Sequence, residues 1–152
     1  MGRLTMSMLV VLLAACALPA RASDPDSKTI NQETIQALES RLQQAPPKDQ
    51  CYLYAELIHQ LTEVSMRQYS AGEVDKATFL LRKVQDFAQK IHLMVSDRDK
   101  RLKNAELLLR HTAFRLNNLL HASSYDDRAL VAQTLTQVNQ ADNAAMMQVF
   151  KQ

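Results

Sequence analysis

A regular apolar repeat between residues 73 and 120 limits how this chain can fold more than any other feature. Its steps alternate between three and four residues, and no Gly or Pro interrupts it. Side chains at that spacing lie along one face of an α-helix. The repeat consists of Val74, Ala77, Leu81, Val84, Ala88, Ile91 and Val95, followed by Leu102, Ala105, Leu109, Thr112, Leu116 and Leu119. The stretch is therefore predicted to be helical, with one apolar face that has to be covered.

Two arrangements of this stretch are open. In the first, Ser96-Asp97-Arg98-Asp99 forms a tight turn in which Ser96 caps a new helix, with Asp99 three residues on as in a capping box. The chain then has helices at about 49–71, 73–95, 97–122 and 126–150, as an antiparallel up-down four-helix bundle requires. In the second, one central helix of about 48 residues runs through this point and is about 70 Å long.

The bundle is the preferred interpretation because the apolar face is wider than the seam of a two-stranded coiled coil. On one long helix the additional apolar residues would be poorly covered unless the protein dimerises, so we expect the bundle to bury them. They are Phe79, Leu80, Phe87, Leu93, Leu107, Leu108 and Phe114. Only 2 of the 152 residues are Gly, which also favours an all-α protein.

A short extra helix is predicted ahead of the bundle. Residues 23–28 are polar and are expected to form a flexible leader, and residues 30–44 place Ile35, Leu38 and Leu42 on one side of a helix. This helix is too short and polar to be stable alone, so weak docking or fraying is expected. Pro46 and Pro47 should stop it. The predicted domains are thus residues 1–22, 23–48 and 49–152.

Local signals predict where the bundle helices begin and end. Asp49 is suited to cap the first of them, and Ser124 with Asp127 resembles a capping box. Gly72 should end the first helix in a left-handed conformation. Small and apolar residues surround that turn, namely Ser65, Gly72, Val74, Ala77 and Leu81. Their spacing resembles the hairpin of a tetratricopeptide repeat, but no second copy follows at about 34 residues, so the resemblance implies only a closely packed antiparallel helix pair.

The N-terminus has the pattern of an export signal. Arg3 precedes a nearly unbroken apolar run that is shorter than the ~20 residues of a membrane span. Ala20-Arg21-Ala22 then offers small residues for cleavage before Ser23. Leu13-Ala14-Ala15-Cys16 resembles the lipobox of bacterial lipoproteins, and in that alternative Cys16 would carry a lipid and hold the protein at a membrane. We expect an exported protein, periplasmic or secreted, or a lipoprotein anchored through Cys16.

The charge balance argues against a nucleic-acid partner. The whole chain has 18 Lys and Arg against 16 Asp and Glu. Cleavage after Ala22 would remove Arg3 and Arg21 and leave a neutral chain, which has little attraction for polyanions. Within residues 97–115 six bases stand against three acids, and Asp99–Lys103 and Glu106–Arg110 pairs at helical spacing predict a solvated face there.

Histidines and methionines give the only candidates for a cofactor or metal site. Glu56 and His59 have the Glu-x-x-His spacing of one half of a di-iron site, but the second pair is missing, so no metal is predicted there. Met66 and His111 form a possible axial pair for haem, although Met is more often a core residue. No cofactor is predicted. Cys51 has no partner in the processed chain and is expected to be a buried apolar residue, with an intermolecular disulfide as the alternative.

No catalytic motif is present. The sequence lacks a Gly-x-Ser-x-Gly, a His-Glu-x-x-His and a phosphate-binding loop, and it holds almost no Gly from which a catalytic loop could be built. The expected function is therefore a non-enzymatic interaction or scaffold module of the cell envelope. It would bind a protein partner, or a second copy of itself, through apolar helix faces. The alternative is a helical bundle that carries a metal or haem.

Overall fold

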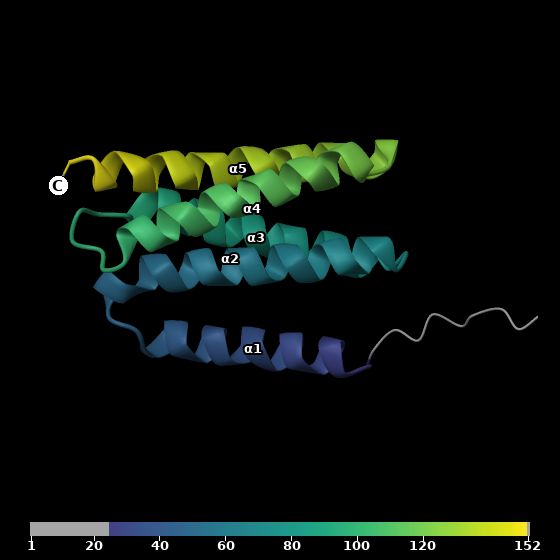
Figure 1. Cartoon of the computed structure of the whole chain (residues 1–152), viewed down its shortest axis with the longest axis horizontal. Coiled ribbons are helices and arrows are strands. Elements are labelled where there is room, and N and C mark those ends of the chain that lie inside the picture. Colours follow the sequence, from purple (N-terminus) through teal and green to yellow (C-terminus); the bar gives the residue numbers. More distant parts are fainter. Residues whose placement is uncertain (1–24, 152) are drawn as a thin grey trace, which may run out of the picture.

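The computed structural model describes residues 25–151 of the chain, with side chains from residue 32 onward. The predicted cleavage after Ala22 and the predicted lipid at Cys16 lie outside this range. The described residues are all-α, as predicted (Figure 1). Their helices are α1 (Pro25–Gln44), α2 (Pro47–Ser70), α3 (Val74–Met94), α4 (Leu102–Ala122) and α5 (Tyr125–Val149). None of them is long and apolar enough to cross a bilayer.

Helices α2 to α5 form the predicted up-down bundle, and α1 packs against α2 (Figure 1). Each of α2 and α5 contacts both α3 and α4, whereas α3 does not contact α4 and α2 does not contact α5. The bundle is therefore a stack of two hairpins, α2–α3 and α4–α5, in which α3 and α4 lie on a diagonal. His59 lies opposite Thr112 and Glu63 opposite Arg115. The residue numbers of the two helices increase in the same direction along this contact, so α2 and α4 run parallel.

The connection between α3 and α4 is longer than predicted. The helix breaks, so the single central helix is excluded, but α4 begins at Leu102 and not at residue 97. The predicted contact does form, since the Ser96 N–H donates to Asp99 Oδ2 at 2.7 Å. This contact closes a turn and caps no helix. A tight turn joins neighbouring helices ~8–10 Å apart, whereas this segment spans the bundle diagonal.

The first helices also begin differently from the prediction. α1 starts at Pro25, inside the predicted leader. The N-cap of α2 is Pro46 and not Asp49, because Pro47 is preorganised for the first helical position and Asp49 lies within the first turn. α1 is also better docked than expected. Its Leu38 is buried against Leu53 and Leu57 of α2, and a salt bridge of 3.0 Å joins Glu39 to Lys83 of α3.

The α2–α3 hairpin turns as the sequence predicts. Gly72 has a φ of 77°, and its N–H donates to the Tyr69 carbonyl at 3.0 Å. The Glu73 N–H donates to the Gln68 carbonyl at 2.9 Å, which completes a Schellman motif. Further along, the buried Ser65 hydroxyl donates to the Ala77 carbonyl at 3.0 Å. The small residues therefore let the two helices approach closely.

The start of α5 is also as predicted. Ser124 is its N-cap, and the Ser124 hydroxyl oxygen accepts from the Asp127 N–H at 3.4 Å. The same hydroxyl donates to Asp127 Oδ2 at 2.7 Å. The side chains of these two residues therefore hold the first turn of α5 and satisfy one of its free N–H groups.

The apolar seam forms the core, but the wider face is only partly covered. Except for the half-buried Val74, the seam residues of α3 and α4 are buried, together with Ile58 and Leu61 of α2 and Val131 and Val138 of α5. Of the additional residues, Leu80, Phe87 and Leu108 are partly buried. The prediction that the bundle buries these residues was wrong for the other four. Their exposed fractions are 62% for Phe79, 76% for Leu93, 50% for Leu107 and 62% for Phe114. Their positions lie opposite the core on α3 and α4.

Candidate functional site

A pair of histidines lies where α2 and α4 run side by side. The rings of His59 and His111 are 5.2 Å apart between centroids and inclined at 47°. His59 Nδ1 is 3.1 Å from Thr112 Oγ1, which itself donates to the Leu108 carbonyl at 2.7 Å. Since the Thr112 hydroxyl proton is engaged, Thr112 can only accept from Nδ1–H. His59 is thereby held as the tautomer whose Nε2 keeps a free lone pair.

The surroundings keep His59 neutral. Burial lowers its pKa from 6.5; the Glu63 carboxylate raises that pKa, while His111 and Arg115 lower it. Glu63 is one turn along α2, and its two oxygens accept from Arg115 at 2.7 and 3.0 Å. The Arg115 hydrogen bond lowers the pKa of Glu63, whereas burial raises it. A neutral imidazole is the form of histidine that binds a transition metal.

The other predicted metal or haem residues are not assembled around this pair. Glu56 is half-buried one turn before His59. Met66 packs against the core. In the parallel register of α2 and α4 it lies beyond the level of His111 by about 10 Å, at ~1.5 Å per residue. Within residues 25–151, no three His, Cys, Asp or Glu side chains are grouped so that they could hold a metal ion.

Cys51 is buried in the core, as predicted, and is a free cysteine. Burial, together with the smaller effect of the nearby Asp99 carboxylate, raises the pKa of its thiol to about 12. Because the thiolate is the reactive form of cysteine, this thiol is chemically inert at neutral pH. Cys51 therefore acts as a small packing residue.

The basic stretch of α4 is mostly engaged in ion pairs. The predicted Glu106–Arg110 pair is present. The predicted Asp99–Lys103 pair is not, because Asp99 precedes α4 and accepts from Ser96 instead. On α5, burial raises the pKa of Asp142, and Arg110 lowers it. Arg110 thus lies between carboxylates of two helices and neutralises charge at the α4–α5 contact.

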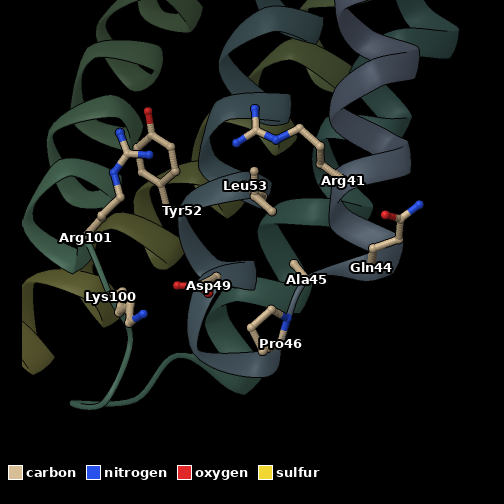
Figure 2. Close-up of a pocket in the computed structure, with 9 residues that line it drawn as sticks. All are labelled: Arg41, Gln44, Ala45, Pro46, Asp49, Tyr52, Leu53, Lys100 and Arg101. Atoms are coloured by element: carbon tan, nitrogen blue, oxygen red, sulfur yellow. The ribbon is translucent and has the colours of Figure 1, made fainter.

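A cleft that sequence analysis did not find opens at the end of the bundle where α1 stops (Figure 2). Its volume is about 320 Å³, and its lining is Arg41, Gln44, Ala45, Pro46, Asp49, Tyr52, Leu53, Lys100 and Arg101. These residues come from the end of α1, the α1–α2 connection, the start of α2 and the α3–α4 connection. No pattern within any one segment shows that they meet, although the basic residues 100 and 101 stand out in the sequence.

The geometry of Arg101 distinguishes this cleft from an ordinary surface depression. Its guanidinium carbon lies 3.4 Å from the centroid of the Tyr52 ring. Its φ is 59°, in the left-handed region, and it is the only non-Gly residue with positive φ in the described part of the chain. An L-residue in this conformation costs ~1–2 kcal/mol relative to the right-handed one. The cleft therefore contains a residue with a strained backbone, whose side chain lies against the Tyr52 ring.

Comparisons of the chain with protein-family models, with curated proteins and with solved structures found no significant match. A function is therefore proposed from the structure itself: the fold, the pair of His59 and His111, the cleft at the end of α1, and the exposed apolar side chains.

Proposed function

We propose that this protein is a non-enzymatic interaction module of the cell envelope, which binds an amphipathic helix of a partner protein along the outer face of α4. The observation that carries the proposal is the exposure of Leu107 and Phe114, 50% and 62%. They lie two turns apart on the same face of α4, with the exposed His111 between them. Large apolar side chains in one line are typical of a helix-binding surface.

The position of α1 supports a helix as the occupant. α1 lies on the outer side of the α2–α3 hairpin, where Leu38 contacts α2 and Glu39 reaches Lys83 of α3. The α4–α5 hairpin is stacked on the opposite side, and within residues 25–151 no helix covers its outer face. A partner helix on that face would occupy a position equivalent to that of α1.

The charge of α4 indicates which kind of helix fits. α4 carries Lys103, Arg110 and Arg115; Arg110 pairs with Glu106 and Arg115 with Glu63 of α2, whereas no ion pair joins Lys103 to another described side chain. The remaining charge of this surface is therefore positive, and two copies of α4 facing each other would gain no complementary charge. A helix with acidic residues beside its apolar stripe would instead gain complementary charge. We therefore propose a different protein, not a second copy, as the partner.

The proposal can be tested by site-specific photo-crosslinking in the native cell. A photoreactive side chain at position 114 should give one adduct of defined mass with another protein, through a segment that is amphipathic and acidic. The exposed Gln89 of α3, a helix that does not contact α4, is the matched control position and should not give that adduct. In a chain with the crosslinker at position 107, Phe114→Ser should reduce the yield while the helical circular-dichroism signal is unchanged. Adducts only between copies of this chain, or equal adducts from position 89, would refute it.

A second candidate function is binding of a transition-metal ion at His59 and His111. The specific observation is the pair of rings 5.2 Å apart, with the His59 tautomer fixed by Thr112. Titration with Cu²⁺, followed by calorimetry, should show one site that His111→Ala removes and that the exposed His92→Ala retains. Equal affinity in the two variants, or no binding by the unaltered protein, would exclude this function.

A further inference from the structure

We propose that the cleft at the end of the bundle binds a phosphate monoester. Three basic side chains line it, Arg41, Lys100 and Arg101, against one acid, Asp49 (Figure 2). No salt bridge joins any of the three bases to another described side chain, whereas Arg110 and Arg115 on α4 are both paired. The bases of the cleft therefore have their charge available for a ligand. This inference is independent of the proposed partner surface on α4.

The two sides of the cleft are held together by the backbone. The Lys100 N–H donates to the Lys48 carbonyl at 2.8 Å, which fixes the α3–α4 connection to the first turn of α2. The neighbouring Asp99 carboxylate accepts from the Ser96 N–H and closes the turn. Lys100 and Arg101 are thus positioned relative to α2 before any ligand arrives. Preorganisation of this kind lowers the entropic cost of binding.

Arg101 is presented in a form that suits an oxyanion. Its guanidinium carbon lies 3.4 Å from the centroid of the Tyr52 ring, a contact that restricts the side chain while its N–H groups remain able to donate. A planar guanidinium binds two oxygens of a phosphate or carboxylate at once. In Figure 2, Arg41 extends toward the cleft from α1, on the opposite side from Arg101. An anion between them would receive donors from two directions.

The backbone strain at Arg101 supports a functional role for its side chain. The conformation at φ 59° would be unstrained for Gly, yet the position carries a long basic residue. Strain of this kind is concentrated at ligand-binding sites, where the rest of the structure maintains it. Nothing in the turn itself requires an arginine.

Charge and size define the class of ligand. Three bases and one acid give the lining a net charge that matches a phosphate monoester, which carries about −1.5 to −2 at neutral pH. The volume of about 320 Å³ is at the small end of the range for small-molecule sites. Asp49 would repel a second anionic group but can accept from a hydroxyl. A hydroxylated phosphate monoester, of the size of a glycerol or sugar phosphate, therefore fits the lining.

Titration of the intact, ¹⁵N-labelled chain with glycerol 3-phosphate tests the proposal by NMR. Saturable shifts are expected for the amides around residues 48–53 and 99–101, and glycerol alone should cause none. Arg41→Gln and Arg101→Gln should each weaken binding by about tenfold or more, as loss of a charge-assisted hydrogen bond does. Arg98→Gln is the matched control, because Arg98 is an exposed base on the same connection that does not line the cleft.

Three results would overturn the assignment. The first is equal weakening by Arg98→Gln, which would indicate diffuse attraction to a basic surface. The second is tighter binding of succinate, which would indicate a carboxylate site. The third is unchanged affinity in Arg101→Gly, a variant that removes the side chain while relieving the backbone strain. An unchanged spectrum outside the cleft in each variant verifies that its fold is intact.

Discussion

The tautomer of His59 shows how one hydroxyl can determine the chemistry of a residue. Thr112 donates to the Leu108 carbonyl within α4, so its oxygen is left to accept from His59. This acceptor therefore selects the His59 tautomer that carries its proton on Nδ1. The Thr112 hydroxyl thus fixes the orientation of the His59 ring, whether the ring binds a metal ion or only packs between the helices.

His59 should make the stability of the fold depend on pH. Burial lowers its pKa in the folded state below the value of 6.5 in the unfolded chain, so unfolding takes up a proton between the two values. His59 therefore does not affect the free energy of unfolding above about pH 6.5, and it lowers that free energy increasingly as the pH falls toward the folded pKa. His59→Gln removes this term. Its free energy of unfolding, measured with urea, should therefore fall less between pH 7.5 and pH 5 than that of the unaltered protein.

The exposed His92 provides the control for this experiment. His92→Gln should leave the pH dependence unchanged, because its ring is not buried in the α2–α4 contact. If His59→Gln has the same pH dependence as the unaltered protein, the ring is not held neutral by its surroundings.

At this scale, the sequence predicted local features better than contacts between helices. The burial of Cys51 and the turn at Gly72 follow from the chemistry of each residue and were predicted correctly. The contact between His59 and His111 could not be predicted, because it depends on α2 and α4 running parallel in a particular register. The positive φ of Arg101 could not be predicted either, since arginine has no preference for that conformation.

Among the elements, α1 is the one whose stability depends on a single small contact surface. It packs against α2 through Leu38, with Ile35 and Leu42 partly buried beside it. The other described side chains of α1, between residues 32 and 44, are mostly polar and exposed and gain little from packing. Its order therefore depends on docking and not on intrinsic helix stability.

Leu38→Ala should release α1 without unfolding the bundle. The truncation removes the buried side chain that joins α1 to Leu53 and Leu57. Hydrogen exchange measured by mass spectrometry should show faster exchange in α1, by about tenfold or more, and unchanged exchange in the core helices. Gln43→Ala, at an exposed position of the same helix, should leave α1 protected. Faster exchange throughout the chain would show that α1 is instead part of the cooperative core.

The boundaries of the elements were predictable where a residue has a specific preference for helix ends. Gly72 and Ser124 lie at the expected helix ends. The α3–α4 connection has neither Gly nor Pro, and the apolar repeat continues in phase across it. The sequence alone therefore does not determine whether the helix breaks there. The length of the connection depends on which helices are neighbours, and apolar periodicity does not contain that information.

In the molecule as a whole, core and surface residues alternate along α4 within a few positions. Leu109 is fully buried in the apolar seam, whereas Leu107, two positions earlier, is half exposed. The two residues are chemically identical and lie on the same helix. The difference between their exposed fractions therefore shows which side of α4 faces the core.

Leu109→Ala should destabilise the bundle by about 2–5 kcal/mol, as the loss of a buried leucine does. Leu107→Ala should change stability by about 0.5 kcal/mol or less, because an exposed substitution leaves no cavity. Urea denaturation followed by circular dichroism measures both. Equal destabilisation by the two variants would contradict the orientation of α4 and, with it, the exposed surface on which a partner helix is proposed to bind.

The stack of hairpins also limits how the protein can assemble. A subunit that adds copies end to end needs two open, complementary surfaces, one for the preceding copy and one for the next. Here α1 packs against α2 at one end of the stack, whereas within residues 25–151 no helix packs against the outer side of the α4–α5 hairpin. A copy that docks through its α4–α5 side therefore finds the corresponding place on α2 of the next copy already filled by α1.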